Sequence, residues 1–272
     1  MRYKIGDVAR ILGISADLLR YYEKKGVVTP YKDAHNDYRY YDSWDINFLM
    51  DCLWFKNFGF SIEQIADMVR IPSEEELQDI FMYKEDELRS TIARCQLLLR
   101  RSEEYRKQLG RIRECLGRCD LQESPEVVRF INRVGNEYPT GEGLEQFARQ
   151  WLRAMPFSHR YFEISKEALC GGDEMDFRWG FALMPDYVRE LDFPVEPPVE
   201  AVPSGKAIHT YFCSRGKNNF TARHLDYVLE WAAQNGYVVS GPAQGTLVAS
   251  LLEADELCGY FECWVPVKED KA

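Results

Sequence analysis

The sequence predicts a multidomain protein of the α and α+β classes. It consists of an N-terminal winged helix-turn-helix, a long dimerisation coiled-coil helix and a C-terminal domain with a duplicated strand-helix-strand-strand unit. Three observations predict this: two short amphipathic helices around a glycine turn, a proline-free helical stretch of about 40 residues, and alternating apolar runs in the remainder. The predicted domains are residues 1–72, 73–119 and 120–272.

Residues 5–26 have the pattern of two helices joined by a tight turn. Apolar residues at positions 5, 8, 9, 11 and 12 define one face of a first helix. Gly13 favours a left-handed turn, Ser15 is a favourable N-cap for a second helix, and Gly26 ends that helix. This order is typical of the helix-turn-helix, whose second helix enters a major groove.

Several motifs then follow in order. Residues 19–23 read LRYYE, residues 38–41 read YRYY in a hairpin-like wing, and residues 56–61 read KNFGFS between two further predicted helices, 44–58 and 61–71. Across about the first 75 residues these motifs resemble the MerR family of transcription regulators. The alternative, a core helix pair with surface charges, leaves the placed basic residues unexplained.

The resemblance implies binding to double-stranded promoter DNA. Arg20 and Tyr21 on the second helix, Tyr38 and Arg39 on the wing, and Lys56 on the next helix would contact mostly phosphates. It also implies activation by distorting promoter DNA for RNA polymerase, in response to a small-molecule effector.

The charge distribution limits how DNA could be bound. The net charge is −10, but residues 1–70 carry 10 basic and 10 acidic side chains, whereas residues 123–272 carry 14 and 23. We therefore expect a few placed cations to hold DNA, with a modest dependence of affinity on salt.

A helix is predicted from residue 74 to about residue 117, after a capping box that begins at Ser73. Its residues recur at steps of three and four, as in a coiled-coil seam, and are mostly apolar: Leu88, Ile92, Cys95, Leu99, Ser102, Tyr105, Leu109, Ile112 and Leu116. Family resemblance favours an antiparallel homodimer through this helix. The alternative is a single solvated linker helix.

The last segment alternates strand-like and helix-like runs. Strands are predicted at 127–134, 159–164, 178–184, 208–213, 246–252 and 260–267, and helices at 142–155 and 221–235. A WGF motif at 179–181, PSGKA at 203–207, Gly241-Pro242 and the closing strand resemble the GyrI-like effector-binding domain of multidrug-binding MerR proteins. In that family an acidic residue among aromatic rings receives the ligand, and Glu262 carries this role over.

The sequence also indicates what the site could bind. Tyr260, Glu262 and Trp264 share one face of an alternating strand, and a carboxylate beside aromatic rings suits small lipophilic cations. We expect Trp179, Phe181 and Tyr211 to form further walls of this aromatic pocket. For each aromatic residue the alternative is ordinary core packing.

Two other functions stay open. The chain could be a metal or redox sensor through Cys95, Cys115 and Cys119, although two thiolates near 117 fall short of the four ligands of a structural zinc site. The effector domain could also hydrolyse its ligand with a buried glutamate as base. Our expectation is a regulator that is not an enzyme, with no catalytic residues, metal ligands or cofactor.

The sequence predicts a cytoplasmic protein without a membrane partner. No apolar run approaches the roughly 20 residues of a membrane span. The first residues run directly into an amphipathic helix rather than a signal peptide.

Overall fold

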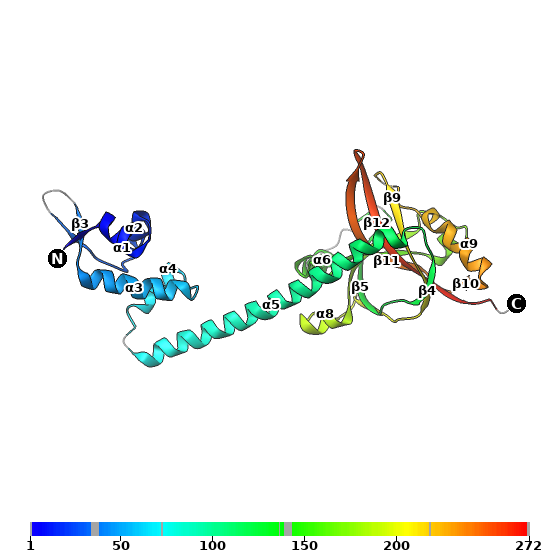
Figure 1. Ribbon diagram of the computed structural model, residues 1–272. Coiled ribbons are helices and arrows are strands. Elements are labelled where there is room, and N and C mark those ends of the chain that lie inside the picture. The colour runs from blue at the N-terminus through cyan, green and yellow to red at the C-terminus, as the bar shows by residue number, and fades with distance from the viewer. Residues whose placement is uncertain are drawn as a thin grey trace. The chain divides into compact units, whose positions relative to one another are not determined.

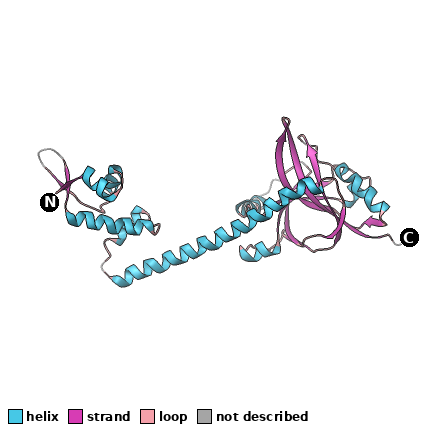
Figure 2. Ribbon diagram, viewed as in Figure 1, coloured by secondary structure: helices cyan, strands magenta, loops and turns pink. Residues whose placement is uncertain are grey.

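The computed structural model describes residues 2–33, 38–71, 73–135, 137–138, 143–217 and 219–270. The chain divides into two compact units, Met1–Ala93 and Arg94–Ala272. The first is mainly helical and the second is built on a large sheet (Figures 1 and 2). The predicted domain limits at 72/73 and 119/120 lie beside the two ends of one long helix, α5 (Glu74–Cys115), and stay predictions.

The first unit contains the predicted pair of helix pairs. Its elements are α1 (Ile5–Leu12), α2 (Ala16–Lys24), α3 (Ser43–Asn57), α4 (Ile62–Met68) and a small sheet in the order β1 (Tyr3–Lys4), β3 (Arg39–Tyr41), β2 (Tyr31–Lys32). β2 and β3 form the predicted wing. The sequence analysis missed β1, which adds a strand on the other side of β3.

Local chemistry fixes the helix boundaries. Gly13 has a φ of 66°, which ends α1 in the left-handed region. The Ser15 hydroxyl oxygen accepts from the backbone N–H of Leu18 at 3.1 Å, and Ser61 forms a capping box with Gln64. Because Leu19 and Tyr22 are fully buried, α2 packs by one face only and leaves the other exposed.

α5 is a helix of 42 residues that begins after Ser73, whose hydroxyl accepts from the N–H of Glu76 at 3.2 Å. In the described residues, no helix is long and apolar enough to cross a membrane. The residues of the predicted seam are not all exposed along one face of the helix. Ile92 and Leu99 are more than half exposed, whereas Ile112 is only 8% exposed because it packs on the chain's own sheet.

The second unit is a fully antiparallel sheet. Its strands follow the order β4 (Asp120–Glu123), β9 (Lys206–Arg215), β12 (Glu256–Glu269), β11 (Ala243–Glu253), β6 (His159–Ile164), β7 (Phe177–Leu183), β5 (Val127–Val134) and β8 (Glu200–Val202), with β10 (Tyr237–Val239) paired to β12. The helices are α6 (Leu144–Arg153), α7 (Lys166–Leu169), α8 (Pro185–Glu190) and α9 (Asp226–Gln234), which the 3₁₀ turn η1 (Ala222–Leu225) precedes.

The strand order contains the duplication that the sequence suggests. In one half β5, α6, β6 and β7 follow one another, and β7 lies between β5 and β6. In the other half β9, α9, β11 and β12 follow one another, and β12 lies between β9 and β11. The halves meet where β6 pairs with β11, from Ala243 opposite Ile164 to Thr246 opposite Tyr161. The short elements β4, β8, β10, α7 and α8 were not expected.

Strand alternation separates the sheet into two faces. Phe162 and Phe261 point into a core with residues of η1 and α9, whereas their neighbours Tyr161 and Glu262 point to the opposite face. A Cβ on Gly245 would lie 2.0 Å from the backbone oxygen of Glu262, so this glycine allows β11 and β12 to approach beside that residue.

Candidate functional site

Helix α2, the second helix of the predicted pair, exposes two of the predicted DNA-contacting residues. Arg20 is exposed and forms an ion pair with Asp17 one turn earlier. The Tyr21 hydroxyl donates to Oε1 of Glu63 at 2.9 Å, and Nζ of Lys25 lies 2.8 Å from the same oxygen. Both predicted side chains lie on the face of α2 that is not buried.

The wing is tied to α2 through Glu23. Nε of Arg39 donates to Oε2 of Glu23 at 2.5 Å, and Nζ of Lys32 lies 3.2 Å from the other carboxylate oxygen. Tyr38 is 55% exposed, with the Lys4 ammonium 5.4 Å from its ring centre. The Glu23 ion pair therefore gives Arg39 a structural role besides the predicted contact with DNA.

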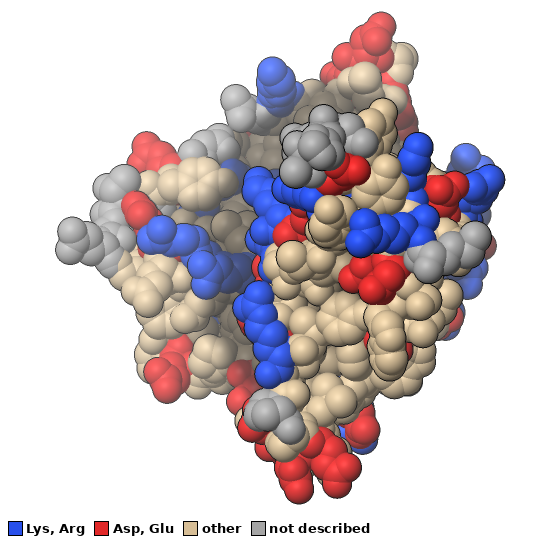
Figure 3. All heavy atoms as spheres, turned by 90° about the vertical axis from the view of Figure 1, so that its left-hand side faces the viewer, with Lys and Arg blue, Asp and Glu red and all other residues tan. Residues whose placement is uncertain are grey.

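Lys56 is exposed in the last turn of α3. Figure 3 shows basic side chains interspersed with acidic ones rather than gathered into one continuous patch. This agrees with the equal numbers of basic and acidic residues in the first 70 positions. The roles of Arg20, Tyr21, Tyr38, Arg39 and Lys56 as DNA contacts stay predictions.

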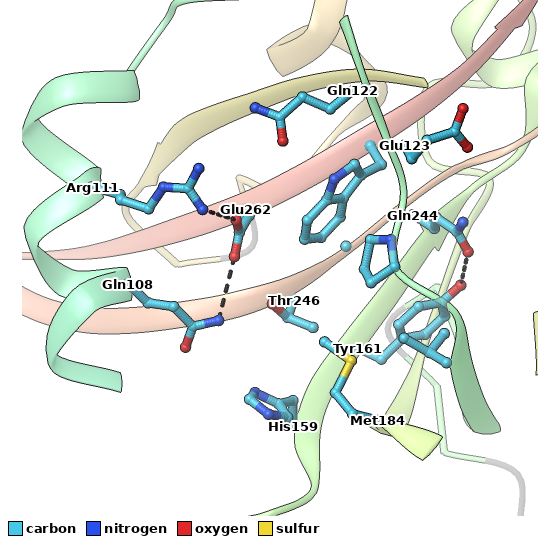
Figure 4. A pocket seen from close by; sticks show the side chains of 14 residues that line it. Gln108, Arg111, Gln122, Glu123, His159, Tyr161, Met184, Gln244, Thr246 and Glu262 are labelled. Atoms are coloured by element: carbon cyan, nitrogen blue, oxygen red, sulfur yellow. Dashed lines mark hydrogen bonds and ion pairs between the residues drawn. The ribbon is translucent and has the colours of Figure 1, made fainter. Parts of the chain in front are cut away.

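The second unit has a hollow of about 300 Å³, which we call the Glu262 pocket (Figure 4). Strands β4, β6, β11 and β12 and helix α5 contribute to its wall. The lining residues are Gln108, Arg111, Gln122, Glu123, Pro125, Val127, His159, Tyr161, Met184, Gln244, Gly245, Thr246, Glu262 and Trp264. The size and the mixture of rings with a few polar groups suit a small organic ligand.

Glu262 is 3% exposed, and its carboxylate is held by three side chains. Nε2 of His209 lies 3.0 Å from Oε1, and Nε2 of Gln108 donates to Oε2 at 3.4 Å. A guanidinium nitrogen of Arg111 lies 3.9 Å from Oε1. Figure 4 shows Gln108 and Arg111 pointing from α5 towards Glu262. These partners offset the cost of burying the carboxylate.

His209 connects Glu262 to a second carboxylate. Its ring is only 1% exposed, and Nδ1 lies 3.2 Å from Oδ1 of Asp120. Because both ring nitrogens face carboxylate oxygens, a ring with a proton on each nitrogen can donate to both, whereas a neutral ring can donate to one only. The imidazole also lies beside the Trp264 ring, with 5.3 Å between ring centres. His209 therefore positions two residues of the pocket.

Tyr211 and Tyr260 lie on the same face of the sheet as Glu262. Tyr211 is opposite Glu262 in the β9–β12 pairing and fully buried, and burial together with the Glu262 carboxylate raises the pKa of its phenol. The Tyr260 hydroxyl donates to Glu253, which with burial raises the Tyr260 pKa to about 12. Both rings pack with Ile112 beneath α5, and neither is among the residues that line the pocket.

Two further residues that were expected to line the pocket lie elsewhere. Trp179 and Phe181 do share a face of β7, as expected, but it is the opposite face of the sheet from Glu262. Trp179 packs with Phe162 and Phe261, and Phe181 stacks with Trp151 of α6 at 6.3 Å between ring centres. The expectation that they form walls around Glu262 is wrong, because both side chains lie on the face of the sheet that the helices cover.

The sequence analysis missed several residues of the site. Gln108 and Arg111 were treated only as part of the long helix, and His209 and Tyr161 were not singled out. The Tyr161 hydroxyl donates to Oε1 of Gln244 at 2.8 Å across the strands that join the two halves. The one available signal was alternation: His209 is two residues from Tyr211, which places both on one face of β9.

The three cysteines of the alternative hypothesis do not form a metal cluster. Cys95 is exposed, Cys115 packs near Ile112, and Cys119 packs against the opposite core. Burial raises the pKa of the Cys119 thiol to about 11, which disfavours the reactive thiolate. Within the part of the chain that the structure describes, no three His, Cys, Asp or Glu side chains are grouped as metal ligands.

Comparison with known proteins supplies the family context. Residues 3–70 match a family described as "MerR HTH family regulatory protein". A Synechocystis protein named "Uncharacterized HTH-type transcriptional regulator slr0701" is 31% identical over 108 residues, which cover 40% of this chain and 77% of that protein. The "HTH-type transcriptional regulator CueR" of Escherichia coli O157:H7 is 27% identical over 131 residues, 48% of this chain and 93% of the relative.

A solved structure extends over nearly the whole chain. It is described as "Cryo-EM structure of EcmrR-DNA complex in EcmrR-RPo", is 17% identical, and covers 98% of this chain and 100% of its own. The TM-score of 0.36 is too low to carry an argument about function.

The Glu23 ion pairs predict how the first unit responds to acid. Burial raises the Glu23 pKa, but hydrogen bonds from Arg39 and Lys32 outweigh it and hold the pKa below its ordinary 4.5. The ionised carboxylate therefore stabilises the fold above about pH 4.5, and this contribution is lost as the pH falls through the folded-state pKa. We expect Glu23→Gln to lower the free energy of unfolding by about 1–2 kcal/mol at pH 7 and to flatten its loss towards pH 3.

Urea titrations of the chain labelled with fluorotryptophan measure the free energy of unfolding of this unit. The fluorine NMR signals of Trp44 and Trp54 report on it. Asp51→Asn, an exposed carboxylate of the same unit, is the control and should leave stability and its pH profile nearly unchanged. Equal acid sensitivity of Glu23→Gln and the parent would contradict the prediction.

Proposed function

Because the chain belongs to the MerR family of helix-turn-helix DNA-binding transcription regulators, we propose that it is an effector-responsive regulator that activates transcription by distorting promoter DNA. The proposal is that the second unit is a GyrI-like domain that binds a small lipophilic, cationic effector in the Glu262 pocket. The single observation that carries it is a carboxylate only 3% exposed at the base of an open hollow beside Trp264.

On this proposal DNA is held by a few placed side chains. Arg20 and Tyr21 on the exposed face of α2 would enter the major groove, while Tyr38 and Arg39 on the wing and Lys56 in the last turn of α3 would contact phosphates. RNA polymerase at the same promoter is the expected protein partner, because a distorted promoter changes transcription only through the polymerase that reads it.

A homodimer through α5 would supply two DNA-binding heads for a palindromic site. The support is the unpaired apolar surface of the helix: Leu88, Ile92 and Leu99 are 43%, 56% and 62% exposed. Apolar side chains at these spacings would be buried by a second copy of the helix. An exposed run of this length is otherwise costly in water.

The proposed pocket recognises its ligand by charge and by stacking. Arg111, the outermost partner of Glu262, is 3.9 Å away and half exposed, so a ligand cation can take its place beside the carboxylate. The Trp264 and Tyr161 rings offer π-faces to a flat cation. Thr246 and Gln244 provide further polar groups.

The signal would pass through α5. Gln108 and Arg111 contact Glu262 from the same helix whose first turns lie in the N-terminal unit. A ligand that replaces these contacts changes the free energy with which α5 binds the sheet. Such a differential contact between two states is what an allosteric response requires.

The DNA contact of Lys56 can be tested with Lys56→Ala. We expect weaker binding to target and unrelated DNA alike, and a slope of log affinity against log salt reduced by about two, since each head of the proposed dimer loses one phosphate contact. Fluorescence anisotropy with labelled duplexes at several salt concentrations measures both. Lys166→Ala, an exposed lysine of the second unit, is the control. An unchanged salt slope would remove Lys56 from the interface.

The dimer is tested with Leu99→Asp. A charge within the apolar surface should dissociate the dimer at micromolar concentration, and light scattering should then give the mass of one chain, 31.8 kDa. Gln96→Asp adds the same charge at another exposed position of α5 and should stay dimeric. A parent chain that is monomeric at high concentration would sink the dimer proposal.

The effector site is tested by titrating lipophilic cations against tryptophan fluorescence. Glu262→Gln should weaken binding about tenfold, about 1.4 kcal/mol, because a neutral amide loses the ion pair. Trp264→Phe should abolish most of the quenching, whereas Trp179→Phe should retain it, since Trp179 lies on the far face of the sheet. If the Glu262→Gln chain binds these cations as well as the parent, Glu262 is not the recognition group.

A further inference from the structure

A second hollow adjoins the Glu262 pocket. It has a volume of about 380 Å³ and we call it the Arg101 groove, after one of the side chains that line it. Gln108, Arg111, His159 and Met184 line both hollows, so the two form one continuous site. Figure 4 shows Gln108 and Arg111 projecting from α5, and His159 and Met184 along the lower edge of the view. A ligand that fills the pocket can therefore extend into the groove.

Arg101 is a buried cation with mainly neutral partners. It is 6% exposed, its Nε donates to the carbonyl oxygen of Pro156 at 2.9 Å, and a terminal nitrogen donates to Nδ1 of His159 at 3.4 Å. A carboxylate oxygen of Glu104 lies 3.8 Å away, beyond hydrogen-bond distance. A buried guanidinium normally has a carboxylate in direct contact.

The nearest carboxylate, that of Glu104, makes no hydrogen bond to Arg101. Glu104 accepts instead from the Tyr187 hydroxyl at 2.8 Å, and Arg100 of the groove already forms a paired contact with Glu190. Asp186 pairs with Arg189.

His159 is an uncharged member of the groove wall. Burial and the neighbouring Arg101 lower its pKa to about 3, so the ring is neutral at physiological pH. Lys107 and Arg111 add two more cations to the wall. The groove therefore has an excess of positive charge around a buried, planar donor.

We propose that the Arg101 groove binds a carboxylate of the effector. The effector class is then an amphoteric aromatic compound, with its lipophilic or cationic body against Glu262 and Trp264 and its acidic end at Arg101. This inference rests on the proposed effector site and deepens it. The guanidinium fork can donate two parallel hydrogen bonds to one carboxylate, and the Nε2 proton of His159 is a third donor, since its Nδ1 accepts from Arg101.

A matched pair of dyes tests the proposal. Rhodamine 110 has a cationic ring system and a free carboxylate, and rhodamine 123 is its methyl ester, so the two differ in that one acidic group. Fluorescence anisotropy of each dye with the full chain gives its affinity. We expect the parent to bind rhodamine 110 about tenfold more tightly, and Arg101→Gln to bind both dyes equally.

Further variants separate the two ends of the site. Lys107 is exposed, so Lys107→Gln does not threaten folding, and it should reduce the preference for rhodamine 110 by about threefold. Arg106 lies on the same helix but lines neither hollow, so Arg106→Gln should retain the preference. Glu262→Gln should weaken both dyes and leave their ratio unchanged.

Each outcome has a distinct meaning. If the parent binds both dyes equally, or prefers the ester, the carboxylate site is wrong while the effector pocket stands. The same holds if Arg101→Gln folds and keeps the preference, or if Arg101→Gln does not fold and Lys107→Gln keeps it in full. If neither dye binds the parent, the aromatic effector pocket itself fails, and the carboxylate site with it.

Discussion

The burial of the Glu262 carboxylate is the constraint on which the second unit's site depends. A carboxylate 3% exposed is stable only with close partners, and the fold supplies them from two elements: His209 from the adjacent strand β9, and Gln108 and Arg111 from successive turns of α5. Strand β9, strand β12 and α5 must therefore all be in place before the site exists. The pocket belongs to the tertiary structure rather than to any one segment.

α5 has two kinds of surface, and the difference connects packing to the proposed function. Near its C-terminus Ile112 is buried against the sheet, whereas Ile92 and Leu99 expose their apolar side chains. The same helix also places Arg101, a buried cation, and Arg111 beside the two hollows. One element thus supplies the proposed dimer surface, the cover of the pocket and the charges that would select a ligand.

The N-terminal unit was largely predictable because its signals are local. A left-handed Gly13, the Ser15 and Ser61 caps and the inward spacing of Leu19 and Tyr22 each depend on residues within about four positions. Helices and caps of this kind are encoded by near neighbours. β1 was missed because two residues make a strand only when a partner strand, here β3, lies beside them.

In the second unit the strands and their alternation were predictable, but the pairing was not. The sequence alone determined that Tyr260, Glu262 and Trp264 share a face of one strand and that Trp179 and Phe181 share a face of another. Only the tertiary structure decided that these faces are opposite, because the order β12–β11–β6–β7 and its registers relate them. Alternation determines which side chains of one strand share a face. The neighbours of that strand in the sheet are determined by contacts between residues distant in sequence. For the same reason the sequence could single out Glu262 only as a candidate, whereas the fold brought His209, Gln108 and Arg111 to it.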